Sequence, residues 1–164
     1  MLLALKKLFT GESICAPFEF TLDLSETEID GVKPFQSAVQ VTGQADSNTE
    51  GVTLSMRAVF DYCTPCDRCA EPVESNMDYR FNHALVLELN NEDNEDYILV
   101  ENYELDLAEL VRADILLELP TKNLCSPDCK GLCPKCGINL NSGSCECDTR
   151  QIDSRLEILK QLID

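Results

Sequence analysis

The sequence predicts an α+β protein in which an antiparallel β-sheet, able to close into a barrel-like form, packs against one helix. Three observations lead to this prediction. Apolar residues recur at every second position over several segments, a later segment has a helical period, and a cysteine-rich segment follows it. Of the 164 residues, 44% are apolar and 26% are charged, which is typical of a folded globular protein.

Four segments have the alternation of a strand with one buried face. These expected strands cover residues 18–24, 39–41, 52–62 and 73–87. The polar segment 44–51 is expected to be a turn between the second and third strands. Residues 63–72 join the last two strands, so the first cluster of cysteines should lie at the tip of a hairpin.

The acidic segment 90–96 is expected to be a solvated hairpin loop, from which residues 97–100 return as a short strand. Asp106 and Glu109 have the spacing of a helix N-cap and its capping box. The helix that they open should end at Leu119, before Pro120. Its inward face is expected to consist of Leu107, Leu110, Val111, Asp114 and Leu117.

The segment 121–150 has almost no apolar periodicity, yet it contains six cysteines. Such a segment cannot build a hydrophobic core, so a bound metal must order it. The apolar residues from Ile152 to Ile163 are spaced for one face of a terminal helix. We therefore expect a body of residues 1–119 and an integrated module of residues 120–164, which together form one domain.

The chain is strongly acidic, since 13 Lys and Arg face 30 Asp and Glu, for a net charge of −17. Such a surface repels phosphate backbones, so nonspecific binding of nucleic acid by the whole surface is disfavoured. The short apolar start before Lys6 and Lys7 does not have the form of a signal peptide, and no apolar stretch reaches the ~18 residues of a membrane helix. These features predict a cytoplasmic protein, in which clustered thiols indicate metal or redox chemistry.

The most local metal motif is in the C-terminal third. Two residues separate Cys133 from Cys136, which lets both sulfurs reach one tetrahedral ion, and Gly137 permits the tight turn that follows. After eight intervening residues, Cys145 and Cys147 can close the site. The spacing therefore predicts a four-cysteine zinc site.

A second zinc site needs residues from distant parts of the chain. Cys66 and Cys69 have the same two-residue spacing, and Cys125 with Cys129 supplies a plausible remaining pair. Together they would connect the hairpin tip to the loop after the helix. Cys63 could replace one of the four, but we expect it to be a spare thiol near the site.

Two other chemistries compete with structural zinc. The spacing of Cys63, Cys66 and Cys69 matches part of the motif by which ferredoxins bind an iron–sulfur cluster. That motif continues with a fourth Cys and a Pro, but this sequence has Val73 and Glu74 at those positions. A thiol-based redox switch is the second alternative, because each Cys-x-x-Cys is formally a redox pair. A redox Cys-x-x-Cys motif normally lies at the start of a helix, whereas Cys66 and Cys69 follow an expected strand.

The sequence offers no recognisable hydrolytic apparatus. His83, the single histidine, alternates with apolar residues, and we expect a core or edge side chain and not a ligand. Cys15 is expected to be a small buried residue. Because closed four-thiolate zinc sites leave no coordination position for a substrate, we predict a protein that is not an enzyme.

Three segments carry a resemblance to a known family. They are Cys66-Asp-Arg-Cys69-Ala-Glu-Pro-Val, the helix from Leu105 to Leu119-Pro120, and Leu124-Cys125-Ser-Pro-Asp-Cys129-Lys-Gly-Leu-Cys133-Pro-Lys-Cys136-Gly-Ile-Asn-Leu-Asn141. These segments resemble the YceD family of large ribosomal RNA accumulation proteins. The resemblance implies a metal-binding protein without enzymatic activity that supports large-subunit ribosomal RNA accumulation or ribosome assembly. It also implies metal ligands at the matching positions, which are Cys66, Cys69, Cys125, Cys129, Cys133, Cys136, Cys145 and Cys147.

The distribution of charge suggests the kind of partner. Between Glu71 and Glu118 there are 14 acidic residues and two arginines, so this region should avoid RNA and suit a basic protein. We expect a ribosomal protein or a ribosome-assembly factor as the partner. Direct contact with RNA would be confined to the zinc module, because the segment 121–150 is nearly neutral.

Overall fold

The computed structural model describes residues 1–49, 51–88 and 97–147 and divides the chain into two compact units. The first unit comprises Met1–Thr64 and Glu74–Thr121. The second comprises Pro65–Val73 together with the chain from Lys122. The second unit thus combines a short segment between two strands with the cysteine-rich segment. The division into residues 1–119 and 120–164 within a single domain stays a prediction.

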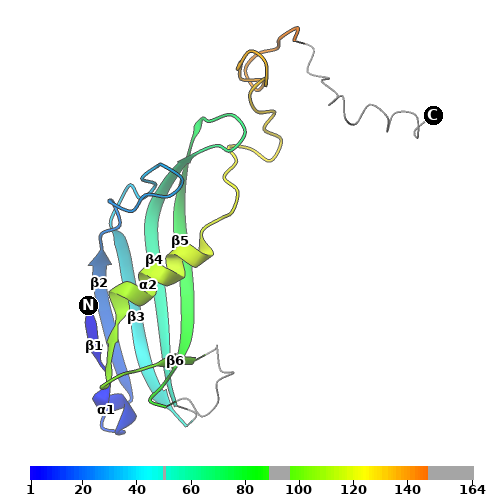
Figure 1. Ribbon diagram of the computed structural model, residues 1–164. Helices are drawn as coiled ribbons and strands as arrows, with labels where there is room; N and C mark the ends of the chain where they lie inside the picture. The colour runs from blue at the N-terminus through cyan, green and yellow to red at the C-terminus, as the bar shows by residue number, and fades with distance from the viewer. Residues whose placement is uncertain (50, 89–96, 148–164) are drawn as a thin grey trace, which may run out of the picture. The chain divides into compact units, whose positions relative to one another are not determined.

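In chain order the described elements are β1 (Leu2–Ala4), α1 (Lys6–Phe9), β2 (Cys15–Leu22), β3 (Val39–Asn48), β4 (Gly51–Pro65), β5 (Pro72–Val86), β6 (Tyr97–Leu99), β7 (Glu104–Asp106) and α2 (Leu107–Glu118). Figure 1 shows the long strands side by side with α2 crossing them. The main sheet has the order β2-β3-β4-β5-β6, and β1 pairs with β7 in a separate ribbon. The predicted α+β class is confirmed.

The main sheet is open, because β2 and β6 form its two edges and the described strands leave these edges unjoined. The barrel-like closure that the sequence allowed is therefore not formed. The terminal helix expected from Ile152 to Ile163 lies outside the described residues.

Strand β3 is longer than its sequence pattern indicates. It runs to Asn48 and pairs with β4, which begins at Gly51, so the expected turn over residues 44–51 is wrong in its extent. The inward positions in this part of β3 are Gly43 and Ala45, which are too small to give a strong apolar alternation. Phe18 of β2 lies opposite Gly43, and a Cβ at Gly43 would come within 2.6 Å of the Phe18 ring. The phenylalanine thus occupies the space that a larger β3 side chain would need.

Strand β6 runs parallel to β5, with Ala84 opposite Tyr97 and Val86 opposite Leu99. The short strand is confirmed, but a hairpin over residues 90–96 would have made the pairing antiparallel, so that expectation is wrong. Residues 90–96 themselves lie outside the described part of the chain.

Helix α2 begins and ends where its sequence signals indicate. The Asp106 side chain accepts a hydrogen bond from the Ala108 backbone N–H, and Leu119 is the C-cap. The buried positions of α2 are Leu107, Val111 and Ile115. Leu117, which was expected on the inward face, is 85% exposed, because positions four residues apart meet the sheet. Of the described helices, α2 is the longer at 12 residues, and neither can cross a membrane.

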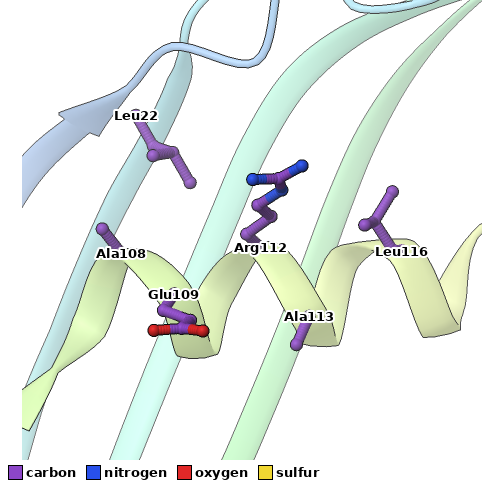
Figure 2. Close-up of a pocket in the computed structure, with 6 residues that line it drawn as sticks. All are labelled: Leu22, Ala108, Glu109, Arg112, Ala113 and Leu116. Atoms are coloured by element: carbon purple, nitrogen blue, oxygen red, sulfur yellow. The ribbon is translucent and has the colours of Figure 1, made fainter. Parts of the chain in front are cut away.

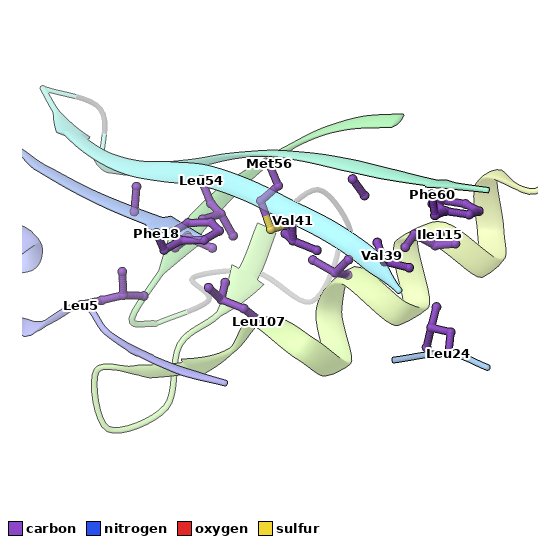
Figure 3. Close-up of a cluster of buried hydrophobic side chains, with 14 of the residues drawn as sticks. Leu5, Phe18, Leu24, Val39, Val41, Leu54, Met56, Phe60, Leu107 and Ile115 are labelled. Atoms are coloured by element: carbon purple, nitrogen blue, oxygen red, sulfur yellow. The ribbon is translucent and has the colours of Figure 1, made fainter. Parts of the chain in front are cut away.

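One hydrophobic core lies between α2 and the main sheet (Figure 3). It contains Leu107 and Ile115 from α2 and Val41, Leu54 and Phe60 from the sheet. Aromatic rings extend the core on one side, where Phe60 makes edge contacts with Tyr62 and Tyr79. The first unit therefore has the apolar packing that stabilises an ordinary small domain.

Cys15 is exposed, so its expected burial is wrong. The even positions of β2, including Phe18 and Phe20, face the core, and Cys15 belongs to the opposite parity. His83 of β5 is half-buried, and its Nε2 lies 2.8 Å from the Asp114 carboxylate of α2. This contact connects the sheet to its covering helix.

Candidate metal centres

The second unit gathers eight of the ten cysteines. All ten lie in the described part of the chain, and none is paired in a disulfide. Two groups of four have sulfurs that all lie within 4.8 Å of one another. The first group is Cys66, Cys69, Cys125 and Cys129, and the second group is Cys133, Cys136, Cys145 and Cys147. The structure thus brings together the two sets that the spacing selected, and ligation of a metal by them stays a prediction.

The first group begins in a tight turn. The Cys66 N–H donates to the Glu71 carbonyl oxygen at 2.7 Å, and the Ala70 N–H donates to the Cys66 carbonyl oxygen at 2.9 Å. Ala70 has a φ of +61°, in the left-handed region that favours glycine. This turn directs both sulfurs of the Cys66–Cys69 pair to the same side.

The second group begins in a turn with the same hydrogen bonds. The Cys133 N–H donates to the Ile138 carbonyl oxygen, and the Gly137 N–H donates to the Cys133 carbonyl oxygen, both at 2.9 Å. Gly137 has a φ of +72° and stands where the first turn has Ala70. The two Cys-x-x-Cys turns are therefore equivalent knuckles, of which only the second has the glycine that its geometry prefers.

The spacing of sulfurs in the first group suits one tetrahedral ion. Cys66 Sγ lies 3.8 Å from Cys129 Sγ, and Cys69 Sγ lies 3.5 Å from Cys125 Sγ. Sulfurs bound about 2.3 Å from a zinc ion lie ~3.8 Å from one another. Three of these cysteines are buried, and their apolar neighbours are Val73 and Leu124.

Arg68 joins the first knuckle to the segment that supplies the other pair of sulfurs. Its guanidinium donates to the Cys129 carbonyl oxygen at 2.8 Å, and its own carbonyl oxygen accepts the Leu132 N–H at 3.0 Å. Gly131 has a φ of +75°, and a Cβ there would lie 2.9 Å from the Arg68 carbonyl oxygen. Gly131 is thus needed both for its backbone conformation and for this close approach.

Backbone donors stabilise particular thiolates. The pKa of Cys66 is lowered to about 6 because the Cys125 and Arg68 N–H groups donate to its sulfur. The pKa of Cys133 is also lowered to about 6, by the N–H groups of Cys136 and Lys135. The amide two residues after the first cysteine, that of Arg68 or Lys135, acts in both knuckles, whereas Cys125 donates to Cys66 from outside its knuckle.

Crowding of sulfurs has the opposite effect on one cysteine of each group, Cys125 in the first and Cys147 in the second. The pKa of Cys125 is raised to about 12, chiefly by Cys69, and that of Cys147 is raised to about 12, chiefly by Cys136. Four sulfurs in one small volume cannot all be thiolates unless a cation offsets their repulsion. The donor set therefore fits a thiophilic divalent ion such as zinc.

Asn141 is a site residue that sequence reasoning missed. It lies in the polar loop 137–144, and its Nδ2 donates to Cys129 Sγ at 3.2 Å. This bond lowers the pKa of Cys129. No sequence signal marks it, because it depends on the path by which the loop returns to the first group.

Cys63 and His83 belong to neither group. Cys63 lies in β4 within the first unit, where its N–H donates to the Pro34 carbonyl oxygen at 2.8 Å. An iron–sulfur run over Cys63, Cys66 and Cys69 would need all three sulfurs at one cluster. The geometry gathers Cys66 and Cys69 with Cys125 and Cys129 instead.

A groove of about 580 Å³ lies beside α2 and is lined by residues of this helix together with Leu22 of β2. Figure 2 shows Arg112 between Leu22 and Leu116 along this groove. Glu109 and Arg112 are its charged lining residues, and the described residues that line it include no thiol and no histidine.

The strained alanine of the first knuckle gives a direct test of the knuckle geometry. We expect Ala70→Gly to stabilise the reduced, metal-loaded protein by ~1 kcal/mol, because a left-handed conformation costs a non-glycine residue about that much. Gly137→Ala should destabilise it by a similar ~1 kcal/mol, since open space surrounds that position and only the backbone conformation is strained. Thermal unfolding of the two variants measures both effects, and a shift of both midpoints in the same direction would contradict the assignment.

Comparison with known proteins adds a family to this geometry. A family model described as "Large ribosomal RNA subunit accumulation protein YceD" matches residues 54–163, more than half of the chain. No solved structure matches.

Several curated proteins are similar to this chain. The uncharacterized protein YlbN of Bacillus subtilis is 27% identical over 149 residues, which cover 89% of this chain and 87% of YlbN. An uncharacterized protein of Mycobacterium tuberculosis is 30% identical over 105 residues, 60% of this chain and 50% of that protein. The maize protein called large ribosomal RNA subunit accumulation protein YCED homolog 1, chloroplastic, is 44% identical over 50 residues, 30% of this chain and 17% of its own.

The matched region includes both four-cysteine groups, most of β4, and β5, β6, β7 and α2. The chain spans about half the length of the mycobacterial relative that it matches. The match of the family model over more than half of the residues shows that the chain belongs to the YceD family.

Proposed function

We propose that this protein binds two structural zinc ions and supports the accumulation of large-subunit ribosomal RNA by binding a partner, without catalysing a reaction. The observation that carries the proposal is the pair of four-sulfur groups inside the region that the YceD family model matches. The family description and the name of the maize relative both refer to accumulation of the large ribosomal RNA subunit.

The composition of the two groups supports a structural metal. Each group supplies four sulfurs, which complete the tetrahedral shell of zinc and leave no open position for water or substrate. Catalytic zinc sites usually have three protein ligands and an exchangeable fourth position. The ions would hold the two knuckles and the segments between them in place.

Charge supports a basic protein as the partner. The described acidic residues of the first unit include Glu101, Glu104 and Glu118, whereas one of its few arginines, Arg57, is already paired with Asp78 at 2.7 Å. Two zinc ions with eight thiolates would add about −4 to the net charge of −17. A ribosomal protein or a ribosome-assembly factor in the cytoplasm would complement this surface.

Direct contact with RNA would be limited to the second unit. Lys122, Lys130 and Lys135 lie in this unit, where the described acidic residues are fewer than on the first. Contact through so few cations would be weak at physiological salt. The partner protein, and not the RNA, is therefore expected to determine the affinity.

A complementation experiment tests the role of the cysteines. In cells that lack the gene, the wild-type chain should restore the ratio of large- to small-subunit ribosomal RNA. The variant Cys66→Ser/Cys125→Ser should fail to do so, because it leaves the first group with two sulfurs.

Cys63→Ser is the matched control, since Cys63 belongs to neither group, and it should complement fully. Equal complementation by all three chains, at equal protein levels, would refute a role for the first metal site. Full activity of Cys66→Ser/Cys125→Ser together with failure of Cys63→Ser would favour thiol redox chemistry.

Affinity capture tests the partner. We expect the full chain to retain a basic ribosomal protein or assembly factor at low salt and to lose it as the ionic strength rises, because screening weakens surface charge pairs. The variant Glu101→Gln/Glu104→Gln/Glu118→Gln should retain less of it at the same salt. Recovery of no such protein at low salt, or recovery that salt does not weaken, would count against an acidic docking surface.

A further inference from the structure

The loop 137–144 belongs to the second cysteine group but contacts the first. Asn141 makes this contact through both ends of its amide. Its Nδ2 donates to Cys129 Sγ at 3.2 Å, and its Oδ1 accepts the Lys130 N–H at 2.8 Å. Leu140 adds a backbone bond from its N–H to the Gly131 carbonyl oxygen at 2.9 Å.

Internal hydrogen bonds of the loop hold Asn141 in this position. The Asn141 N–H donates to Asn139 Oδ1 at 2.9 Å, and the Asn139 carbonyl oxygen accepts the N–H groups of Ser142 and Gly143 at 3.2 and 3.0 Å. Leu132 and Asn139 also form an isolated β-bridge. The contact with Cys129 is therefore built into the fold of the loop.

Both ends of this loop are cysteines of the second group. Cys136 precedes it and Cys145 follows it, so an ion bound to both sulfurs would close the loop. This closure restricts the conformations of the loop in advance. The loop then loses less conformational entropy when Asn141 forms its hydrogen bond with Cys129 Sγ. Occupancy of the second group should thus make the hydrogen bond to Cys129 easier to form.

We propose that the two metal sites are thermodynamically coupled through Asn141, so that an ion in either group raises the affinity of the other. This inference rests on the zinc binding proposed above. A hydrogen bond to a ligand sulfur spreads the charge of the thiolate, and loss of such supporting contacts typically lowers metal affinity ~10- to 100-fold. Thermodynamic linkage requires that an ion in the first site raises the affinity of the second site by the same factor as an ion in the second site raises the affinity of the first.

A cobalt titration tests the coupling. Reduced full-length chains are titrated with Co²⁺ in the absence of oxygen and in competition with a chelator, and thiolate-to-cobalt absorption reports binding. We expect Cys136→Ser/Cys145→Ser, which removes the second site, to weaken binding at the first site ~10-fold or more. Asn141→Asp keeps the oxygen that accepts the Lys130 N–H but loses the donor to Cys129, and it should weaken the first site ~10- to 100-fold.

The combined variant separates coupling from independent damage. When Asn141→Asp is added to Cys136→Ser/Cys145→Ser, the total loss at the first site should be smaller than the product of the two separate losses. A total loss equal to the product of the two separate losses would show that Asn141 does not transmit the effect, and it would overturn the proposal.

Ser126→Asp is the matched control for the added charge. Ser126 lies between Cys125 and Cys129, and its Oγ accepts the Asp128 N–H at 3.3 Å, a role that an Asp carboxylate can keep. We expect first-site affinity close to that of the wild type. An equal loss for Ser126→Asp and Asn141→Asp, or no loss when the second site is removed, would contradict the proposal. If the wild-type chain bound no Co²⁺ at either site, the zinc-binding proposal itself would fail, and the coupling with it.

Discussion

Convergence of eight sulfurs into two groups is the constraint on which the second unit depends. Its buried residues include Cys66, Cys69 and Cys129, with Val73 and Leu124 as the apolar neighbours. The first unit, in contrast, buries Phe60 and many aliphatic side chains between a sheet and a helix. Because the described residues of the second unit bury so little apolar surface, the proposed metal ions would supply much of its folding free energy.

Strong local patterns explain which parts of the fold could be predicted. The alternation over residues 52–62 and 73–87 and the N-cap Asp106 each specify an element with little help from the rest of the chain. The parallel direction of β6 could not be predicted, because three residues carry no directional information. The three-residue strands β1 and β7 could not be predicted either, because each is too short to show an alternation and pairs with a segment far away in the sequence.

At the candidate site, spacing identified which sulfurs could share an ion but not what holds them there. The Cys-x-x-Cys motifs bring neighbouring thiols together through backbone geometry alone. Arg68 and Asn141 act through contacts with residues far away in the sequence or across a loop, and such contacts leave no local pattern. Ala70 has the left-handed backbone conformation of Gly137, but because it is not a glycine the sequence did not indicate this conformation.

Metal content is the most direct measurement of the central claim that two four-sulfur groups order the second unit. Native mass spectrometry with elemental analysis of reduced protein should give two zinc ions per chain. Removal by a chelator should abolish amide protection in the second unit while the sheet of the first unit stays protected. Iron with labile sulfide, intramolecular disulfides without metal, or an ordered second unit after complete metal removal would contradict the account.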